Sequence, residues 1–442
     1  MNRATGVRGG RAPLSIAARG WGAILARAKT FIAEGQDMSQ RVVGIVGTMD
    51  TKGPEFAFVK ERIEALGLGT LVVNAGIAGD PKLTPDIDAS EVAEAAGTTL
   101  SELRAEGDRG ASVTAMADGV AQIVPRLHAE GEIQGVISLG GSAGTTIGTA
   151  AMRALPVGVP KVMVSTLAAG DVQPYVGTRD IAMMYSVVDV AGVNRVSRLV
   201  FSNAAHAIAG MVQSQAPEGA DDRPLIAATM FGVTTPCVTR ARERLESAGY
   251  EVLVFHATGT GGRAMEDLVR GGFIKGVLDV TTTELADEVA GGELSAGPDR
   301  LEIAGKLGIP QIVCPGALDM VNFGPPDGIP TKFSDRLFYR HNPTVTLMRT
   351  TAEENRAMGE VIAGKLSAAA GPVKFFWPTK GVSAIDAEGQ PFHDADADAA
   401  FIEALRANLA GSVDLVELDA NINDDAFADA IADALIEALA DA

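Results

Sequence analysis

The stretch "GVISLGGSAGTT", residues 135–146, runs an apolar strand directly into a loop with three glycines, followed by two threonines. Glycine adopts φ > 0 without penalty and lets a ligand approach the backbone closely. A helix that begins at Thr145 or Thr146 would direct unpaired N–H groups and its positive dipole end toward an anion. The alternative is a tight strand-to-helix turn with no ligand. The stretch therefore predicts a strand–loop–helix unit, and its neighbours must decide whether it holds a phosphate.

The same rhythm of apolar strand, polar loop and amphipathic helix repeats along the whole chain. Strands are predicted at 41–47, 69–76, 135–141, 160–166, 224–230, 250–257, 274–281, 309–315 and 372–378. Helices are predicted at 53–66, 109–130, 145–154, 194–213, 235–248, 260–271, 299–307, 351–368 and 423–441. The strands are continuous apolar runs, as expected when helices cover both faces of a parallel sheet.

These elements predict two α/β domains, each a doubly wound, mainly parallel-sheet (Rossmann-like) unit, with a cleft between them. A polar stretch at 213–224 is interpreted as the linker, so that 41–212 forms a nucleotide-binding domain and 225–442 a second domain. Residues 1–37 carry six basic and two acidic residues. We interpret 1–40 as a basic, disordered extension or an upstream start, rather than as a transit peptide.

Composition limits the classes of partner. The net charge of −19 argues against nucleic acid and anionic membrane, which require a basic face. No apolar run approaches the roughly 18 residues that span a bilayer. Cys237 and Cys314 lie in apolar surroundings and are expected to be buried free thiols in a reducing cytoplasm. The sequence thus predicts a cytoplasmic protein whose partners are small molecules or further copies of itself.

Ligands of open parallel sheets bind beyond the carboxyl ends of the strands, so the residues just after each strand are the candidates. In the first half these ends are rich in Gly, Ser, Thr and Asp, as in "GTMDTKG" with Thr48, Asp50 and Lys52. Such groups suit a polyanion, and an aspartate can hold a hydrated magnesium ion. The alternatives are helix capping or an Asx turn for Asp50 and Asp171, and a solvated surface lysine for Lys52. Neither a Walker A loop nor GxGxxG after the first strand is present.

In the second half, the strand ends carry His256, Arg263, Asp279 and Glu284. A histidine with carboxylates and an arginine could perform acid–base chemistry on an anionic substrate. The alternative for His256 is a hydrogen-bonded structural residue. Asp319 and Asn322 begin a long Pro- and Gly-rich loop, 315–345, which is interpreted as a lid. No metal-spaced His/Cys set is present, so metal ligands stay unknown.

Several long motifs together resemble one family, the Tm-one-like ATP-binding proteins. They include "GTMDTKG", "GGSAGT", "TMFGVTTPCV", "FHATGTGGRAMEDLV", "TTTELADE" and "PGALDMVNFGP", and the resemblance covers about residues 41–410. It implies a two-subdomain α/β protein that binds ATP with Mg²⁺, often as a homodimer. The plant members continue into a further domain that this sequence does not contain, so antiviral inhibition is not transferred.

The resemblance also suggests which residues contact ligand. The implied nucleotide contacts are Gly47, Thr48, Asp50, Lys52, Gly140, Gly141, Ser142, Gly144, Thr145, Ser165 and Asp171. Tyr175, Arg179 and Tyr185 are expected to line the interdomain cleft.

Three functions remain open at this point. The first is a cytoplasmic ATP/Mg²⁺-binding protein with an undefined catalytic role, forming a homodimer or higher homo-oligomer. The second is an ATP-independent hydrolase or lyase that acts on a small carboxylated or phosphorylated metabolite in the cleft. The third is a binding or inhibitory protein that nucleotide stabilises.

Overall fold

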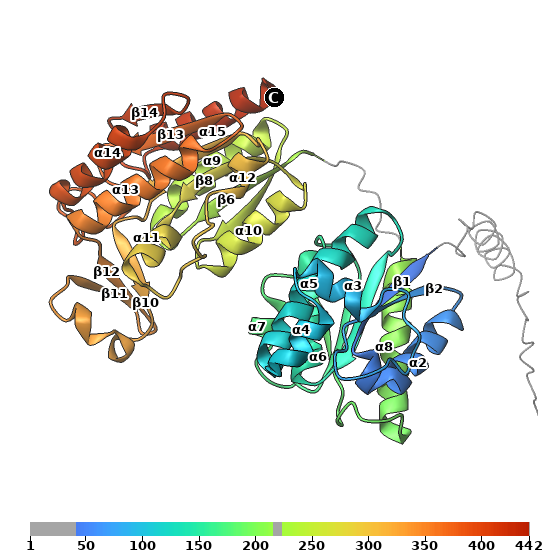
Figure 1. Cartoon of the computed structure of the whole chain (residues 1–442). Coiled ribbons are helices and arrows are strands. Elements are labelled where there is room, and N and C mark those ends of the chain that lie inside the picture. The colour runs from blue at the N-terminus through green and yellow to red at the C-terminus, as the bar shows by residue number, and fades with distance from the viewer. Residues whose placement is uncertain (1–40, 215–222, 442) are drawn as a thin grey trace, which may run out of the picture.

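The computed structural model describes residues 41–214 and 223–441 (Figure 1). The predicted N-terminal extension and most of the predicted linker lie outside the described residues. The described residues form two α/β domains, each built on its own parallel sheet. The predicted fold class is confirmed.

The first domain is a five-stranded parallel sheet in the order β2-β1-β3-β4-β5. Its strands are β1 (Val42–Gly47), β2 (Gly69–Asn74), β3 (Gly135–Gly140), β4 (Lys161–Ser165) and β5 (Ala182–Tyr185). Its helices are α2 (Met49–Glu64), α3 (Ala89–Ala95), α4 (Leu100–Glu106), α5 (Arg109–Ala129), α6 (Ser142–Ala154), α7 (Gln173–Val176) and α8 (Arg195–Gln213). The chain continues from β1 to β2 on one side and then returns to β3 on the other side of β1. The order in which strands are added to the sheet therefore reverses between β1 and β3.

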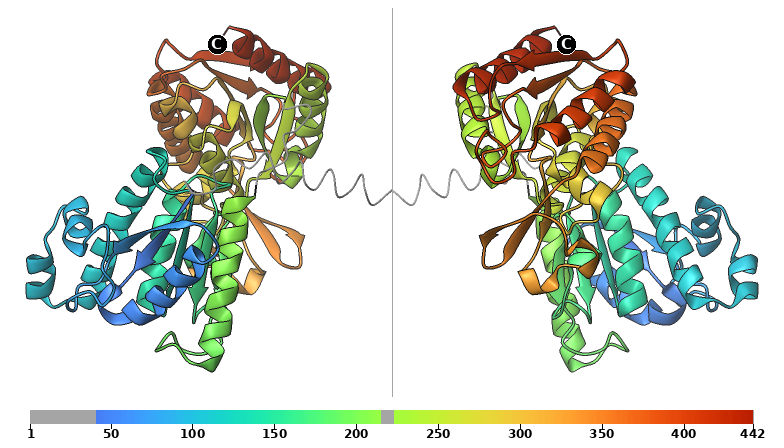
Figure 2. Two further views of the ribbon diagram at one scale, coloured as in Figure 1. Left: turned by 90° about the vertical axis from the view of Figure 1, so that its right-hand side faces the viewer. Right: turned by 90° about the vertical axis from the view of Figure 1, so that its left-hand side faces the viewer.

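Helices cover both faces of this sheet, which is why its strands are apolar throughout. Phe56 of α2 and Phe201 of α8 pack with Ile45 on one face. Met116 of α5 and Ile147 of α6 pack with the opposite face. Figure 2 shows the long α8, in bright green, running along the sheet.

The second domain repeats this strand order and adds one strand. Its parallel sheet has the order β14-β13-β9-β8-β6-β7, so that β7-β6-β8-β9-β13 corresponds to β2-β1-β3-β4-β5. The strands are β6 (Leu225–Met230), β7 (Glu251–His256), β8 (Ile274–Thr281), β9 (Gln311–Gly316), β13 (Val373–Pro378) and β14 (Asp414–Leu418).

The helices of the second domain again cover both faces of the sheet. The face with α9 (Thr235–Ser247) and α15 (Asp425–Ala440) also buries Cys237 and Cys314, which are free thiols. Burial raises the pKa of Cys237 to about 12, which makes it a poor nucleophile. The other face has α10 (Thr260–Arg270), α11 (Thr283–Ala290), α12 (Ile303–Lys306), α13 (Ala352–Ser367) and α14 (Ala395–Asn408).

The prediction that residues 315–345 form a long lid loop is wrong. Residues 315–345 instead contribute to a three-stranded antiparallel sheet, β10-β12-β11, with β10 (Met320–Phe323), β11 (Phe338–Asn342) and β12 (Val345–Arg349). Its connection contains two short 3-10 turns, Pro326–Gly328 and Thr331–Phe333. Phe323, Phe333 and Met348 pack into the core formed with α11 and α13, which anchors this sheet to the domain.

The two domains touch through charged side chains. Arg179, in the loop after α7, forms an ion pair of 2.9 Å with Asp267 of α10. The Thr178 hydroxyl donates a hydrogen bond to the same carboxylate. Tyr185 ends the edge strand β5 and is 44% exposed. None of the described helices is both long and apolar enough to cross a membrane.

Candidate functional site

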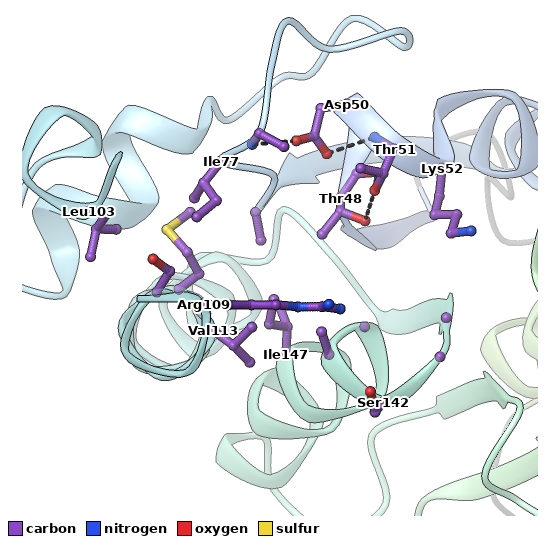
Figure 3. A pocket seen from close by; sticks show the side chains of 18 of the residues that line it. Thr48, Asp50, Thr51, Lys52, Ile77, Leu103, Arg109, Val113, Ser142 and Ile147 are labelled. Atoms are coloured by element: carbon purple, nitrogen blue, oxygen red, sulfur yellow. Dashed lines mark hydrogen bonds between the residues drawn. The ribbon is translucent and has the colours of Figure 1, made fainter. Parts of the chain in front are cut away.

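A cavity of about 770 Å³ lies at the reversal point of the first sheet, beyond the carboxyl ends of β1 and β3 (Figure 3). One wall is the segment Thr48 to Lys52, directly after β1, and a second is Gly140 to Gly144, between β3 and α6. The third wall comes from the segment after β2 and from residues 103–116. This is the position at which parallel sheets of this strand order bind ligands.

The second wall exposes the beginning of α6, which starts at Ser142 rather than at the predicted Thr145. The first intrahelical hydrogen bond of this end runs from Thr145 N–H to Gly141 C=O, at 2.8 Å. The N–H groups of the residues between them have no intrahelical partner. Gly141 is the N-cap and has no side chain to accept from them. This end of α6 is therefore open to an external acceptor.

The glycines of this segment are required for two different reasons. A Cβ at Gly140 would lie 2.8 Å from the Cα of Gly144, so these two residues let strand and helix touch. A Cβ at Gly141 would have as its nearest neighbour the Thr166 hydroxyl, at 3.7 Å. Gly140 and Gly144 thus shape the wall, whereas Gly141 leaves space in front of the helix.

Asp50 joins the first wall to the third. Its side chain is buried, its Oδ1 accepts from Thr51 N–H and its Oδ2 from Ala78 N–H, both at 2.7 Å. Gly76 makes room for this carboxylate, because a Cβ there would lie 2.2 Å from Oδ1. Lys52 interrupts the helical geometry of α2, with φ −121° and ψ 18°. It forms no ion pair within the described parts of the chain.

Two further cationic side chains line the cavity, although neither follows a strand. Arg109, the first residue of α5, extends across the cavity between Thr48 and Ser142 (Figure 3). Arg104 donates through Nε to the carbonyl of Ile77 at 2.7 Å. Arg104 lies within α4 and Arg109 at the start of α5, so the positions of the strand ends do not indicate them.

Aspartates and apolar side chains complete the lining. Asp108 caps α5 by accepting from the N–H groups of Gly110 and Ala111. Asp189 also faces the cavity, and its carboxylate makes no hydrogen bond or ion pair with a described residue. The apolar part is formed by Ile77, Leu103, Val113, Met116 and Ile147.

Of the predicted nucleotide contacts, seven line the cavity: Thr48, Asp50, Lys52, Gly140, Gly141, Ser142 and Gly144. The other four do not. A Cβ at Gly47 would lie 2.0 Å from the Phe56 ring, which is a packing requirement. Thr145 and Ser165 are buried and share a hydrogen bond of 2.7 Å. Asp171 is exposed and accepts from Gln173 N–H at 3.0 Å, which is the Asx turn considered as its alternative.

Family models match almost all of the described chain. Residues 41–217 match "Uncharacterised protein family (UPF0261) N-terminal domain", and residues 223–439 match the C-terminal domain of the same family. This chain belongs to the UPF0261 family.

Proteins similar to this chain come from bacteria and from tomato. A UPF0261 protein of Clostridium tetani is 56% identical over 392 residues, which cover 88% of this chain and 97% of that protein. The ToMV resistance protein Tm-1(GCR237) of Solanum lycopersicum is 40% identical over 424 residues. That alignment covers 90% of this chain and 55% of the tomato protein.

The likeness to one solved structure is weak. A UDP-N-acetylglucosamine 2-epimerase from Rickettsia bellii aligns with 62% of this chain and 78% of its own, at 11% identity and a TM-score of 0.21. A superposition of that quality indicates nothing about the ligand of this family member.

The position in the second domain that corresponds to the cavity is filled by the chain itself. Arg300, 1% exposed, donates to both oxygens of Asp279 at 2.5 and 2.7 Å, and through Nε to Glu284 at 2.7 Å. The second oxygen of Glu284 accepts from the N–H groups of Gly259 and Gly262. Thr229 of β6 also donates to Asp279 of β8. The guanidinium thus lies against β6 and β8, the pair that corresponds to β1 and β3.

This network bears on the predicted acid–base residues. Asp279 and Glu284 are fully engaged as partners of Arg300, which favours a structural role over proton transfer. His256 is exposed and stacks on Phe231, with ring centroids 5.2 Å apart. Arg263 is exposed on α10, and neither it nor His256 lines the 770 Å³ cavity. The structure does not bring the four residues together as one open site.

A second buried network in this domain has more carboxyl groups than cations. Arg349 contacts Asp386 at 3.2 Å and Asp398 at 2.9 Å. Asp319, fully buried, accepts from the Ser383 hydroxyl at 2.9 Å. Burial raises the pKa of Asp386 to about 9, and the charges of Asp319 and Asp398 raise it in the same direction, while Arg349 lowers it. Burial likewise raises the pKa of Asp319 to about 6.

We expect the second domain to become less stable as the pH rises from about 6 to about 9. In this range the folded state keeps protons that the unfolded chain, with an Asp pKa of about 3.9, has already released. An excess of bound protons in the folded state means that the free energy of unfolding falls as pH increases. The chain has two tryptophans, Trp21 and Trp377. A Trp21→Phe background lets Trp377 report thermal unfolding of this domain.

Asp386→Asn should flatten this pH profile, since asparagine is a neutral substitute for the protonated acid. Asp396→Asn, at an exposed position on α14, is the matched control and should leave the slope unchanged. A thermal midpoint that rises between pH 6 and pH 9 would contradict the assignment of protons to this network.

Proposed function

We propose that this protein binds ATP, together with Mg²⁺, in the 770 Å³ cavity of its first domain. The observation that carries the proposal is the meeting of an uncapped helix N-terminus with Lys52, Arg104 and Arg109 around one cavity. Helix N-termini and cationic side chains are the usual partners of phosphate groups. ATP is also the ligand that the motif resemblance implies.

The lining divides along the cavity into a polar and an apolar part, as an amphipathic ligand requires. The phosphates would lie against the N–H groups at the start of α6, within reach of Arg109 and Lys52 (Figure 3). The adenine ring would pack against Ile77, Leu103 and Val113. Ligand cavities typically combine an apolar lining with a few polar groups that fix orientation, and have volumes of about 300–1,000 Å³.

The protein offers Mg²⁺ few ligands of its own. Among the described residues there is no group of three or more His, Cys, Asp or Glu side chains placed to hold a metal ion. Magnesium commonly binds through substrate phosphates and one or two carboxylates, and keeps several waters. Asp189, the carboxylate without a partner in the described structure, would accept from such a water. The bound ion would partly neutralise the phosphates.

Calorimetric titration with ATP and Mg²⁺ tests the site, with ADP production followed in the same samples. Lys52→Met and Arg109→Met should each weaken binding about tenfold, because each removes a charge-assisted contact with a phosphate. Arg126→Met is the matched control: it lies on the same helix as Arg109, is exposed and is outside the cavity.

Each outcome has a clear meaning. Saturable binding that both cavity variants weaken supports the proposal, and ADP formation would add a catalytic role. No saturable heat at millimolar ATP would overturn it and leave the ATP-independent enzyme as the next hypothesis to test. Binding without turnover would favour the third function, a protein that nucleotide stabilises. A homodimer in the cytoplasm remains our expectation for the assembly and its location.

A further inference from the structure

A second cavity, of about 570 Å³, lies in the second domain beyond the carboxyl ends of β13 and β14. Its walls include Trp377 at the end of β13, Asn421 in the segment after β14, and Asp398 and Ile402 of α14. The first domain has no counterpart of β14, so the wall that Asn421 forms has no equivalent there. It is separate from the cavity proposed to bind ATP.

Several polar groups in its walls already have partners. The Asn421 amide donates to the carbonyls of Lys380 and Gly381 at 3.0 and 3.1 Å. The Lys380 ammonium pairs with Asp419 at 3.0 Å. The Asn421 amide thus holds one wall in place, and the charge of Lys380 has an exposed partner outside the cavity lining.

Two other polar side chains of the walls are Glu388 and His393. Glu388 is exposed at the cavity and has no ion-pair partner among the described residues. His393 Nδ1 lies 3.1 Å from the carbonyl oxygen of Asp386. A carbonyl can only accept, so the His393 Nδ1–H donates this hydrogen bond. The Glu388 carboxylate is the charged acceptor that stays available to a ligand.

The charge behind the wall has the same sign. Asp398 lines the cavity and shares Arg349 with Asp386, while Asp319 lies in the same buried network. Asp386 keeps its proton near neutral pH, so the carboxylates of Asp398 and Asp319 are left with one guanidinium. A positive charge placed next to Asp398 would reduce the excess of negative charge in this network, whereas an anion would increase it.

We propose that this cavity binds a small organic cation, a primary amine whose ammonium group lies between Glu388 and Asp398 and whose carbon chain packs on Trp377 and Ile402. The open face of an indole attracts an ammonium group and also provides apolar contact. One face of Trp377 is covered by Phe401, with ring centroids 5.5 Å apart, which fixes the orientation of the indole. The ammonium protons satisfy acceptors that otherwise face only water.

The full chain with Trp21→Phe makes Trp377 its only tryptophan and thus a reporter placed in the cavity wall. Titration with 1,4-diaminobutane near neutral pH should change the Trp377 fluorescence in a saturable way, and calorimetry should show the matching heat. Glu388→Gln should weaken this binding about tenfold, since one charged partner is lost. Glu360→Gln, exposed on α13 and outside the cavity, is the matched control and should leave it unchanged.

Other results would overturn the proposal. One such result is that tens of millimolar amine produces neither a fluorescence change nor heat. A second is that Glu388→Gln binds the amine with the same affinity as the parent protein. A third is that MgCl₂ or sodium acetate alone gives the same response as the amine. Glu388 is exposed, so its variant is expected to fold. Gly141→Val, which alters only the first cavity, should bind the amine normally. The outcome at the second cavity is thereby independent of whether ATP binds at the first.

Discussion

A Gly141→Val variant is expected to fold normally and to bind ATP at least about a hundredfold more weakly. The backbone at Gly141 has φ −84° and ψ −155°, an extended conformation that valine also adopts. The nearest atom to the added Cβ is the Thr166 hydroxyl, at 3.7 Å, which is an ordinary contact distance. The branched side chain would instead occupy the space in front of the first N–H groups of α6, where we place the phosphates.

Titration calorimetry measures the affinity, and circular dichroism with thermal unfolding checks the fold. The matched control is Gly210→Val, an exposed position on α8 where a Cβ meets nothing within 4 Å. Gly140→Val should behave differently from both, because its Cβ would collide with the Gly144 backbone and destabilise the domain. Unchanged ATP affinity in a folded Gly141→Val protein would remove the start of α6 from the site.

Arg300→Met is expected to lower the free energy of unfolding of the second domain by about 3–5 kcal/mol. The substitution keeps most of the side-chain volume but leaves Asp279 and Glu284 buried without their cation. Removing one partner of a buried ion pair is far more damaging than removing the whole set, because the remaining charges stay desolvated. A triple variant with Asp279→Asn and Glu284→Gln should therefore recover part of the lost stability.

Urea unfolding of these variants, followed by Trp377 fluorescence in the Trp21→Phe background, gives the difference in their free energies of unfolding. Arg242→Met is a suitable control, since that residue forms an exposed pair with Glu246 one turn away on α9 and should change stability little. A folded Arg300→Met protein of unchanged stability would show that Asp279 and Glu284 take up protons or water at no cost. Their role as acid–base groups would then have to be reconsidered.

The fold followed from the sequence wherever a strand was a continuous apolar run. The strands that carry both sheets were predicted close to their observed bounds, except β5 and β14, which are short edge strands. The sheet of β10, β11 and β12 was missed because its short strands alternate with Pro- and Gly-rich turns that read as a loop. Antiparallel pairing across such turns depends on contacts with α11 and α13, which no local pattern reveals.

The candidate site was predicted only in part, again for physical reasons. Parallel strands bring their carboxyl ends to one edge, which is why Thr48 and Gly141 were placed at the same cavity from the sequence alone. Arg109 enters from the start of a helix, so strand ends could not indicate it. In the second domain, Asp279 and Glu284 resembled open acids because their partner, Arg300, does not follow a strand. It lies in a turn before α12, within the stretch 299–307 that was predicted to be helical throughout.

The repeated strand order of the two domains has a consequence for how each half depends on its surroundings. In the second half, Arg300 of the chain itself neutralises Asp279 and Glu284, so these buried carboxylates need no bound cation. In the first half, the proposed ATP site lies at the corresponding end of the sheet, and a nucleotide bound there would add stability that grows with the logarithm of its concentration. The supply of that small molecule would therefore influence the stability of the first half directly, whereas the second half has the buried Arg300 network with or without it.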